Sequence, residues 1–292
     1  MIKPFLKYLL QEKRYSKHTV CSYETDITQF QIHLEGLDLD LSLEKAHFKV
    51  LRSWIVSLIE DGINPRSVNR KIASLRSFYK FLLKREIIDD NPTAKLRPLK
   101  TAKALPEFVL ESEMNELLDK VAFGEDSEGL RDKLIIELLY GTGMREAELI
   151  NLKKPDINFF NNTLKVLGKR NKERIIPVSK DNIHLIKAYL KVKEEELSPT
   201  NNWLLTTGKG EKCYPMMIYR IVKKYLGYIT KTHKKSPHVL RHTYATHLLN
   251  NGADLNAVKD LLGHANLAAT QVYTHNSLDK LKSVFDQAHP KA

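Results

Sequence analysis

Residues 236–242 read Ser-Pro-His-Val-Leu-Arg-His, and they are followed by Leu-Leu-Gly-His at 261–264 and Val-Tyr-Thr-His at 272–275. A serine followed by a proline predicts a helix start, because the hydroxyl can accept from free backbone N–H groups and the proline ring already has helical φ. Gly252 predicts where that helix stops. His238 and Arg241 are three residues apart, so we expect both on one face of its first turn, where the backbone favours an anion.

Two more short helices are predicted downstream. Asp254 is a candidate N-cap for the first, and Gly263 would end it so that His264 comes just past the C-terminus. Asn266 is a candidate cap for the second, which would carry Tyr273. A tyrosine hydroxyl can act as a covalent nucleophile when its proton is removed or arginines stabilise the phenolate. The stretch therefore has the groups needed to break and remake a phosphodiester bond: His238, Arg241, His264 and Tyr273.

Each of these residues also has a simpler interpretation. A single histidine or tyrosine near a helix end is usually structural, and a His/Arg pair is often a solvated face. A zinc site is a further alternative, since His238, His242 and His247 could share one side of the helix. The pattern lacks the glutamate of the metalloprotease motif, and Cys213 has no cysteine neighbour to complete a ligand set.

The composition indicates a polyanionic partner or an anionic surface. The chain of 292 residues has a formal net charge of +12 and a pI near 9.4, and its 42% apolar content is sufficient for hydrophobic cores. No apolar run is long enough for a transmembrane span, and the first residues lack a signal-peptide pattern. Two separated cysteines, Cys21 and Cys213, are typical of a reducing cytoplasm.

Residues 1–90 predict an N-terminal helical bundle. We expect helices over about 2–13, from Ser16, from Ser42 to Gly62, and from Asn64-Pro65 onward, each with an apolar stripe at helical spacing. The last of these helices is rich in lysine and arginine on its polar side. A solvated basic face is the alternative, but in so basic a chain we expect contacts to DNA phosphates. The candidate DNA-binding residues are Arg66, Arg70, Lys71, Arg76 and Lys80.

Residues 91–106 are interpreted as a linker, because three prolines interrupt a lysine-rich stretch. A second domain then occupies residues 107–292. It begins with helices, including one over 130–140 that Gly141-Thr142-Gly143 is expected to break. Arg145 would open the next short helix, three residues before Glu148, whose carboxylate could orient the guanidinium.

Strand-like segments follow at 156–160, 163–167 and 174–178, with a turn at 161–162 and a basic hairpin at 168–173 that carries Lys169. A lysine at a hairpin tip is normally solvated. A tip that enters a groove would also suit a general acid. Helices are predicted again over 180–193 and 214–228. A last short amphipathic helix, over 277–285, would pack on its own domain or on a neighbouring protomer.

Several of these motifs, in this order, resemble the tyrosine recombinase (phage integrase) family. The resemblance rests on three regions. Residues 141–149 are similar to the family's first arginine box, and residues 168–174 are similar to its lysine hairpin. The third region is the series His238-x-x-Arg241, Leu262-Gly263-His264 and Tyr273. The match covers nearly the whole chain, and the Xer site-specific recombinases are the most similar subfamily. Arg170 stands where the family often has glycine, and Met144 and Glu146 flank the arginine where Leu-Arg-Val is more common.

The resemblance implies a fold that is mainly α with a small antiparallel β-sheet. An N-terminal SAM-like core-binding bundle and a C-terminal catalytic domain would form a C-shaped clamp on double-stranded DNA. It also implies homo- or hetero-tetramers of protomers on two inverted-repeat sites, a DNA translocase as a possible activator, and no metal or nucleotide cofactor. The implied process is resolution of chromosome dimers at a dif-like site.

The same resemblance assigns catalytic roles. Tyr273 would attack the phosphorus to give a 3′-phosphotyrosyl link, and Lys169 would protonate the 5′ oxygen. The guanidiniums of Arg145 and Arg241 would neutralise the non-bridging oxygens, which suits their forked charged donors. His238 would assist proton transfer at the tyrosine, and His264 would donate to the phosphate.

Three rival functions remain open at this stage. A mobile-element or phage integrase would use the same chemistry. A strand-swivelling topoisomerase of type IB would cut and reseal one strand as a monomer. A non-catalytic DNA-binding protein would retain the fold, and a Tyr273→Phe change would then leave its activities unaltered.

Overall fold

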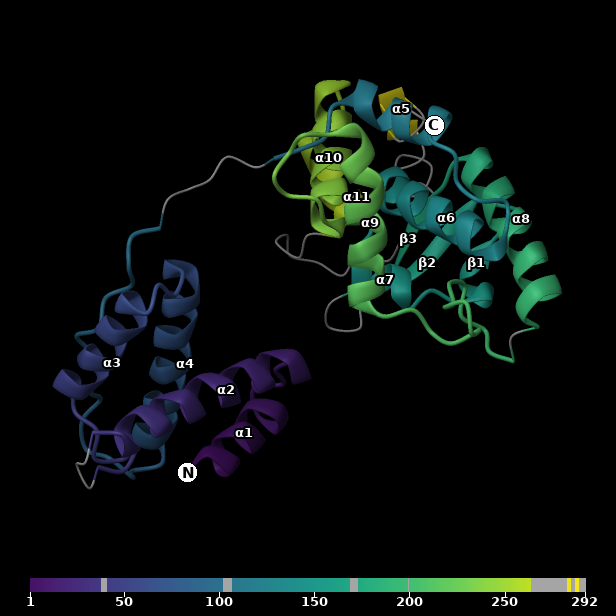
Figure 1. Ribbon diagram of the computed structural model, residues 1–292. Helices are drawn as coiled ribbons and strands as arrows, with labels where there is room; N and C mark the ends of the chain where they lie inside the picture. Colours follow the sequence, from purple (N-terminus) through teal and green to yellow (C-terminus); the bar gives the residue numbers. More distant parts are fainter. Residues whose placement is uncertain are drawn as a thin grey trace. The chain divides into compact units, whose positions relative to one another are not determined.

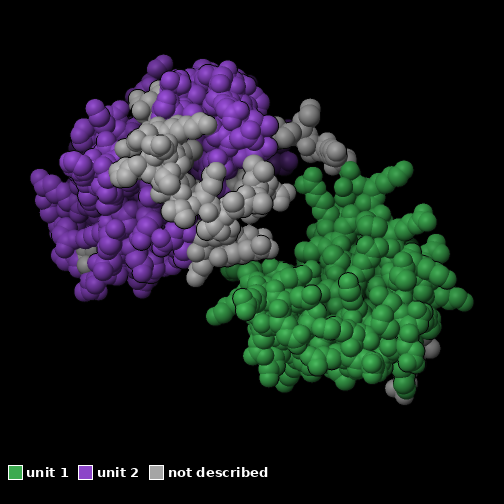
Figure 2. Space-filling view, turned by 180° about the vertical axis from the view of Figure 1, so that it is seen from behind, with its two compact units in different colours: residues 1–104 green, residues 105–292 purple. Residues whose placement is uncertain are grey.

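The computed structural model describes residues 1–37, 41–101, 107–168, 173–198, 200–263, 283–284 and 287–288. The chain divides into two compact units, residues 1–104 and 105–292, which are coloured separately in Figure 2. Among the described residues, no helix combines the length and the hydropathy needed to cross a membrane.

The described part of the first unit forms a bundle of α1 (Ile2–Gln11), α2 (Lys17–Glu35), α3 (Phe48–Glu60) and α4 (Pro65–Lys84), shown in purple to blue in Figure 1. α4 packs on α2 and α3, and α1 packs on α2. Two predicted helix starts are confirmed by their caps. The Ser16 hydroxyl accepts from the N–H of Thr19 at 3.2 Å, and the Asn64 side chain accepts from the N–H of Arg66 at 2.9 Å.

The predicted start of α3 at Ser42 is wrong, since the helix begins six residues later, at Phe48. Tertiary contacts explain the difference. The side chain of Leu43 is buried, and its carbonyl accepts a hydrogen bond from the hydroxyl of Tyr79 on α4 at 2.8 Å. This bond holds the segment as a turn on the bundle, so the helix starts only after the extended residue His47.

A buried ion pair joins α2 to α4. The carboxylate of Asp26 is fully buried and accepts from the Lys71 ammonium at 3.0 Å and from the Ser74 hydroxyl at 2.7 Å. It also accepts from the Arg70 guanidinium, whose side chain remains 45% exposed. The prediction that Lys71 contacts DNA is therefore corrected, because this ammonium lies inside the bundle and is already paired with a carboxylate.

Part of the segment interpreted as a linker lies against α4. Asn69 exchanges two hydrogen bonds with the backbone of Leu99, at 2.7 and 2.9 Å, and Leu96 is buried in the core of the first unit. The guanidinium of Arg76 donates to the carbonyl of Leu96. Residues up to 99 therefore extend the bundle, and Arg76, a candidate DNA contact, also anchors this extension.

The described part of the second unit is mostly helical. Its helices are α5 (Glu111–Lys120), α6 (Ser127–Thr142), α7 (Glu146–Ile150), α8 (Lys180–Leu197), α9 (Pro215–Ile229), α10 (Pro237–Asn250) and α11 (Leu255–Leu262), with a short 3-10 turn at Lys154–Asp156. The strands β1 (Ile157–Asn158), β2 (Thr163–Leu167) and β3 (Glu173–Pro177) form an antiparallel sheet in the order β1-β2-β3. The mainly α fold with a small antiparallel sheet is thus confirmed.

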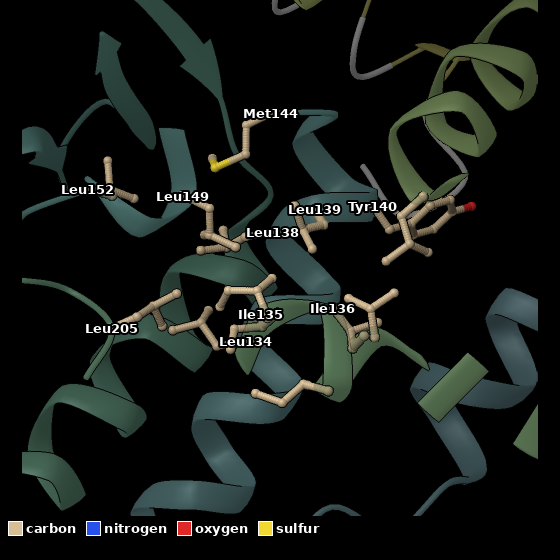
Figure 3. Close-up of a cluster of buried hydrophobic side chains, with 14 of the residues drawn as sticks. Leu134, Ile135, Ile136, Leu138, Leu139, Tyr140, Met144, Leu149, Leu152 and Leu205 are labelled. Atoms are coloured by element: carbon tan, nitrogen blue, oxygen red, sulfur yellow. The ribbon is translucent and has the colours of Figure 1, made fainter. Parts of the chain in front are cut away.

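Helix α6 is the centre of this unit. Its residues are buried on nearly every side, and it packs against α7, α8, α9 and α10. Figure 3 shows Leu134, Ile135, Leu138 and Leu139 within the hydrophobic cluster around it. A helix that is buried on nearly every side lies inside the core rather than on its surface. Both of its ends are therefore fixed, including the C-terminal end that leads to Arg145.

The buried pair in the first unit gives a stability prediction. Replacing Asp26 with alanine leaves the Lys71 ammonium buried without a carboxylate, which should cost about 3–5 kcal/mol. The chain has two tryptophans, Trp54 in the first unit and Trp203 in the second. In a Trp203→Phe background, urea denaturation followed by fluorescence therefore reports on the first unit through Trp54.

The matched control is the exposed pair between Glu12 and Arg85, which lie 2.9 Å apart with side-chain exposures of 48% and 54%. Removing this carboxylate with Glu12→Ala should cost under about 1 kcal/mol. If the two variants lost the same free energy of unfolding, burial would not account for the contribution of the Asp26 pair to stability.

Candidate active site

Arg145 is positioned by the turn between α6 and α7. The predicted helix break falls only at Gly143, since Gly141 and Thr142 still belong to α6. Gly143 has φ +59, the left-handed conformation that glycine adopts without strain. A Cβ at this position would lie 2.4 Å from the Tyr244 ring and 2.9 Å from Leu262. Because Gly143 has no Cβ, α10 and α11 can pack close to this turn and therefore close to Arg145, the residue just before α7.

Glu148 orients Arg145, as the three-residue spacing predicted. Its carboxylate accepts from the backbone N–H of Arg145 at 2.8 Å and from the guanidinium at 2.9 Å. Burial alone would raise the pKa of Glu148. The hydrogen bonds and charge of Arg174, and then those of Arg145, hold that pKa below its ordinary value. The side chain therefore stays ionised at neutral pH and acts as a hydrogen-bond acceptor.

Arg174, on β3, was missed by the sequence analysis. Its guanidinium makes a two-pronged ion pair with Glu148, at 2.6 and 2.8 Å, and is only 5% exposed. The sequence does contain a signal for the burial of Arg174, because successive side chains of a strand alternate between its two faces. Arg174 has the same parity as the buried Ile176 and Val178, so its side chain is expected on the buried face.

Arg241 lies buried on the first turns of α10. It donates to the carbonyl of Gly143 at 2.5 Å and to that of Leu262 at 2.7 Å. Burial, and then the nearby charges of Arg145 and Arg174, lowers the pKa of Arg241 to about 10. The guanidinium is still charged at neutral pH, in a cluster of positive charge.

The C-terminus of α11 is where these arginines meet. Arg174 donates to the carbonyl of Leu261 at 3.3 Å, Arg241 to that of Leu262, and Arg145 to that of Gly263 at 3.2 Å. The last carbonyls of a helix have no partner within the helix and carry the negative end of its dipole. They therefore attract guanidiniums and fix their positions.

His238 opens onto the same pocket as Arg145 and Arg241. The pocket has a volume of about 600 Å³ and is also lined by Met144, Glu146, Ala147, Pro215, Met216, Tyr219, Ser236 and Pro237. His238 is exposed, and its neighbour Arg241 is buried. Pro237 is the first helical residue, as predicted, but Ser236 makes no side-chain capping bond. The predicted serine cap is wrong, which leaves the first N–H groups of α10 without that hydroxyl partner.

Lys169, His264 and Tyr273 lie outside the described residues, as do the predicted third helix at 266–273 and nearly all of the predicted tail helix. The segments that lead to two of them are described. Gly263, with φ +65, ends α11 as predicted and precedes His264. Gly168 ends the described part of the hairpin before Lys169, and Glu173 resumes it.

The structure gives His247 a role in packing. The carbonyl of Val109 can only accept, so the His247 Nε2 donates to it at 3.0 Å. The Nδ1 of the neutral ring then accepts from the Tyr140 hydroxyl at 2.9 Å. Burial lowers the pKa of His247, which favours this neutral form. Among the described residues no group of three potential ligands could hold a metal ion, so the zinc interpretation of His238, His242 and His247 finds no support.

Comparison with known proteins identifies the class. Residues 107–279 match the phage integrase family, and residues 2–86 match the phage integrase N-terminal SAM-like domain. The chain therefore belongs to the phage integrase family, and it is a tyrosine recombinase, a site-specific DNA recombinase.

The relatives to which the chain is similar include tyrosine recombinases of the Xer type. The chain is similar to tyrosine recombinase XerC of Staphylococcus carnosus, at 40% identity over 99% of this chain and 96% of the relative. It is also similar to tyrosine recombinase XerC of Chlorobaculum parvum, at 35% identity over 100% of this chain and 94% of the relative. The fold matches that of XerH site-specific recombinase bound to a palindromic difH substrate, with a TM-score of 0.73 and 22% identity. The match covers 97% of this chain and 83% of the XerH chain.

The glycine that precedes Arg145 gives a second prediction. Gly143→Ala places a methyl group at a left-handed φ and against the Tyr244 ring. Strain and overpacking together should cost about 2–5 kcal/mol in urea denaturation followed by circular dichroism.

Gly252→Ala is the matched control, because Gly252 has φ +86 and a Cβ there would meet nothing within 4 Å. This variant should lose only the free energy needed to hold an alanine at a left-handed φ, about 1–2 kcal/mol. If the two variants lost the same stability, the close approach of Tyr244 to Gly143 would not be a constraint on the fold.

Proposed function

We propose that this recombinase cuts and rejoins DNA through a 3′-phosphotyrosyl intermediate, with Tyr273 as the nucleophile. The observation that carries the proposal is the pocket in which His238 and the guanidiniums of Arg145 and Arg241 are combined. A phosphodiester resists attack because its anion repels nucleophiles and its alkoxide leaving group is poor. Two fixed guanidiniums at one pocket address the first of these barriers.

The proposed first step is a transesterification. The Tyr273 oxygen forms a bond to phosphorus as the bond from phosphorus to the 5′ oxygen breaks. His238 takes up the phenol proton, and Lys169 supplies a proton to the leaving 5′ oxygen. Arg145, Arg241 and His264 donate to the non-bridging oxygens, on which negative charge develops. A 5′ hydroxyl of a second strand then reverses these steps, so the bond energy is retained without metal or nucleotide.

In our proposal, the first unit supplies cations that hold the DNA backbone. Arg66 and Lys80 are exposed on α4, and neither belongs to an ion pair among the residues of this unit that the structure describes. Arg70 is partly exposed, and Asp26 fixes its direction. Arg76 is exposed as well, although its guanidinium also holds Leu96. These four residues are what remains of the five predicted DNA contacts once the buried Lys71 is removed.

The biological role that we propose is Xer-type resolution of chromosome dimers at a dif-like site. The support is the similarity to XerC proteins over almost the full length of both chains. The assembly would be a homo- or hetero-tetramer on two inverted-repeat sites, activated by a DNA translocase, in the cytoplasm. A mobile-element integrase would instead act at the ends of its own element.

A nicked suicide substrate tests the nucleophile. Built from a dif-like site of the source chromosome, it should trap the wild-type chain as a covalent adduct on a denaturing gel. Tyr273→Phe should give none, because the attacking oxygen is missing, while DNA binding is retained. An adduct that persists in this variant would remove Tyr273 from the proposed role. Adduct formation on an element end but not on the chromosomal site would support the integrase alternative.

Salt dependence tests the first unit. Arg66→Ala or Lys80→Ala should weaken DNA binding for any sequence and reduce the slope of log K against log salt by about 1 for each lost phosphate contact. Arg85→Ala is the control, because that guanidinium is already paired with Glu12 at 2.9 Å. Binding measured by fluorescence anisotropy between low and moderate salt gives the slopes. Unchanged slopes for both test variants would contradict phosphate contact by α4.

A further inference from the structure

Arg174 and Arg145 share one carboxylate. The Oε1 atom of Glu148 accepts from the Nη1 of Arg145 at 2.9 Å and from the Nη1 of Arg174 at 2.6 Å, while Oε2 accepts from the Nη2 of Arg174 at 2.8 Å. Arg174 is 5% exposed and does not line the pocket, whereas the Arg145 side chain is 37% exposed and does. Arg174 therefore acts on the pocket only through its neighbours.

The charges of Glu148 and Arg145 explain why a second arginine is needed beside this carboxylate. A carboxylate that orients Arg145 also cancels its charge, and a buried anion beside the pocket would repel a phosphate. Pairing Glu148 with a second, buried guanidinium removes this conflict, because the Glu148 charge is then balanced by Arg174. Arg145 keeps its orientation and its full positive charge toward the pocket.

Arg174 also contacts the end of α11. Its Nε donates to the carbonyl of Leu261, and a Cβ on Gly263 would lie only 3.0–3.3 Å from the Arg174 side chain. Gly263 in turn accepts from Arg145 at 3.2 Å. The Arg174 guanidinium thus holds both acceptors that orient Arg145, the Glu148 carboxylate and the terminal turn of α11.

We propose that Arg174 is a positioning residue for Arg145: by pairing with Glu148 and anchoring the end of α11, it aims the Arg145 guanidinium at the scissile phosphate and prevents the Glu148 carboxylate from offsetting its positive charge. This inference rests on the proposed function, since it requires that Arg145 contact that phosphate. Arg174 itself touches no reacting atom. Its contribution is confined to the step in which charge develops on the non-bridging oxygens.

The experiment compares single-turnover cleavage of the suicide substrate at saturating DNA by the wild type and three full-length variants. Arg174→Met removes the buried cation and leaves Glu148 to neutralise Arg145, so cleavage should slow by roughly 100-fold, with little change in the Kd for DNA. Arg174→Met with Glu148→Gln removes both charges but leaves an amide oxygen to orient Arg145. This double variant should cleave faster than Arg174→Met alone.

Arg174→Lys is the third variant and retains a buried cation without the two-pronged geometry. It should fold, as judged by circular dichroism, and should cleave at an intermediate rate. It keeps the test decisive if the methionine variant fails to fold, because wild-type cleavage by a folded lysine variant would overturn the proposal. A further loss in the double variant relative to Arg174→Met would also overturn it, since that result indicates a packing role.

A second substrate separates charge stabilisation from protonation of the leaving group. With a neutral methylphosphonate at the scissile position, the penalty of the Arg174 variants should shrink to a few-fold, because less negative charge has to be stabilised. Rescue by a 5′-bridging phosphorothiolate, whose thiol leaves without an acid, would instead place the effect on Lys169 and contradict the proposal. Absence of any adduct from the wild type would reject the proposed function, whereas wild-type rates in all variants would reject only this inference.

Discussion

The site depends on one electrostatic arrangement, the capture of arginines by the Glu148 carboxylate and by the C-terminal carbonyls of α11. Guanidiniums that lie close together repel each other, and their burial removes hydration. The structure offsets both costs with acceptors that are themselves in need of donors. The helix-end carbonyls lack partners within α11, and Glu148 would be a costly buried anion if it were alone. Each group thus satisfies a requirement of the other.

The fold provides these acceptors at the right places. Helix α6 is buried along its length, so its C-terminal turn at Gly143 has a fixed position in the core. Gly143 lets α10 and α11 pack closely there, and its carbonyl accepts from Arg241. Strand β3 brings Arg174 to the same place from the sheet. Residues from separate parts of the sequence therefore meet because one helix and one glycine define the point around which they pack.

The sequence predicted the local features of this arrangement well. Residue spacing and the positions of proline and glycine gave the helices around Arg145, Arg241 and Gly263, because these features depend on neighbouring residues. It was wrong where distant contacts decide. α3 starts later than predicted because the Tyr79 hydroxyl binds the Leu43 carbonyl. Lys71 is not a DNA contact because its ammonium is buried in the bundle and paired with Asp26. The burial of Arg174 could have been predicted from the alternation along β3, but its pairing with Glu148 could not, because the two residues lie 26 positions apart.

The same geometry explains why arginine, rather than lysine, suits positions 145 and 241. A guanidinium has five N–H groups in one plane, so some can bind the protein while others face a ligand. Arg145 gives one bond to Glu148 and one to Gly263, and Arg241 gives one to Gly143 and one to Leu262. Each therefore has further donors beyond those that fix it. An ammonium with three donors on a flexible stem would have to loosen its hold on the protein to bind a phosphate with two bonds. In the reaction proposed above, fixing the cation before the DNA arrives removes the need to order it while negative charge develops on the phosphate oxygens.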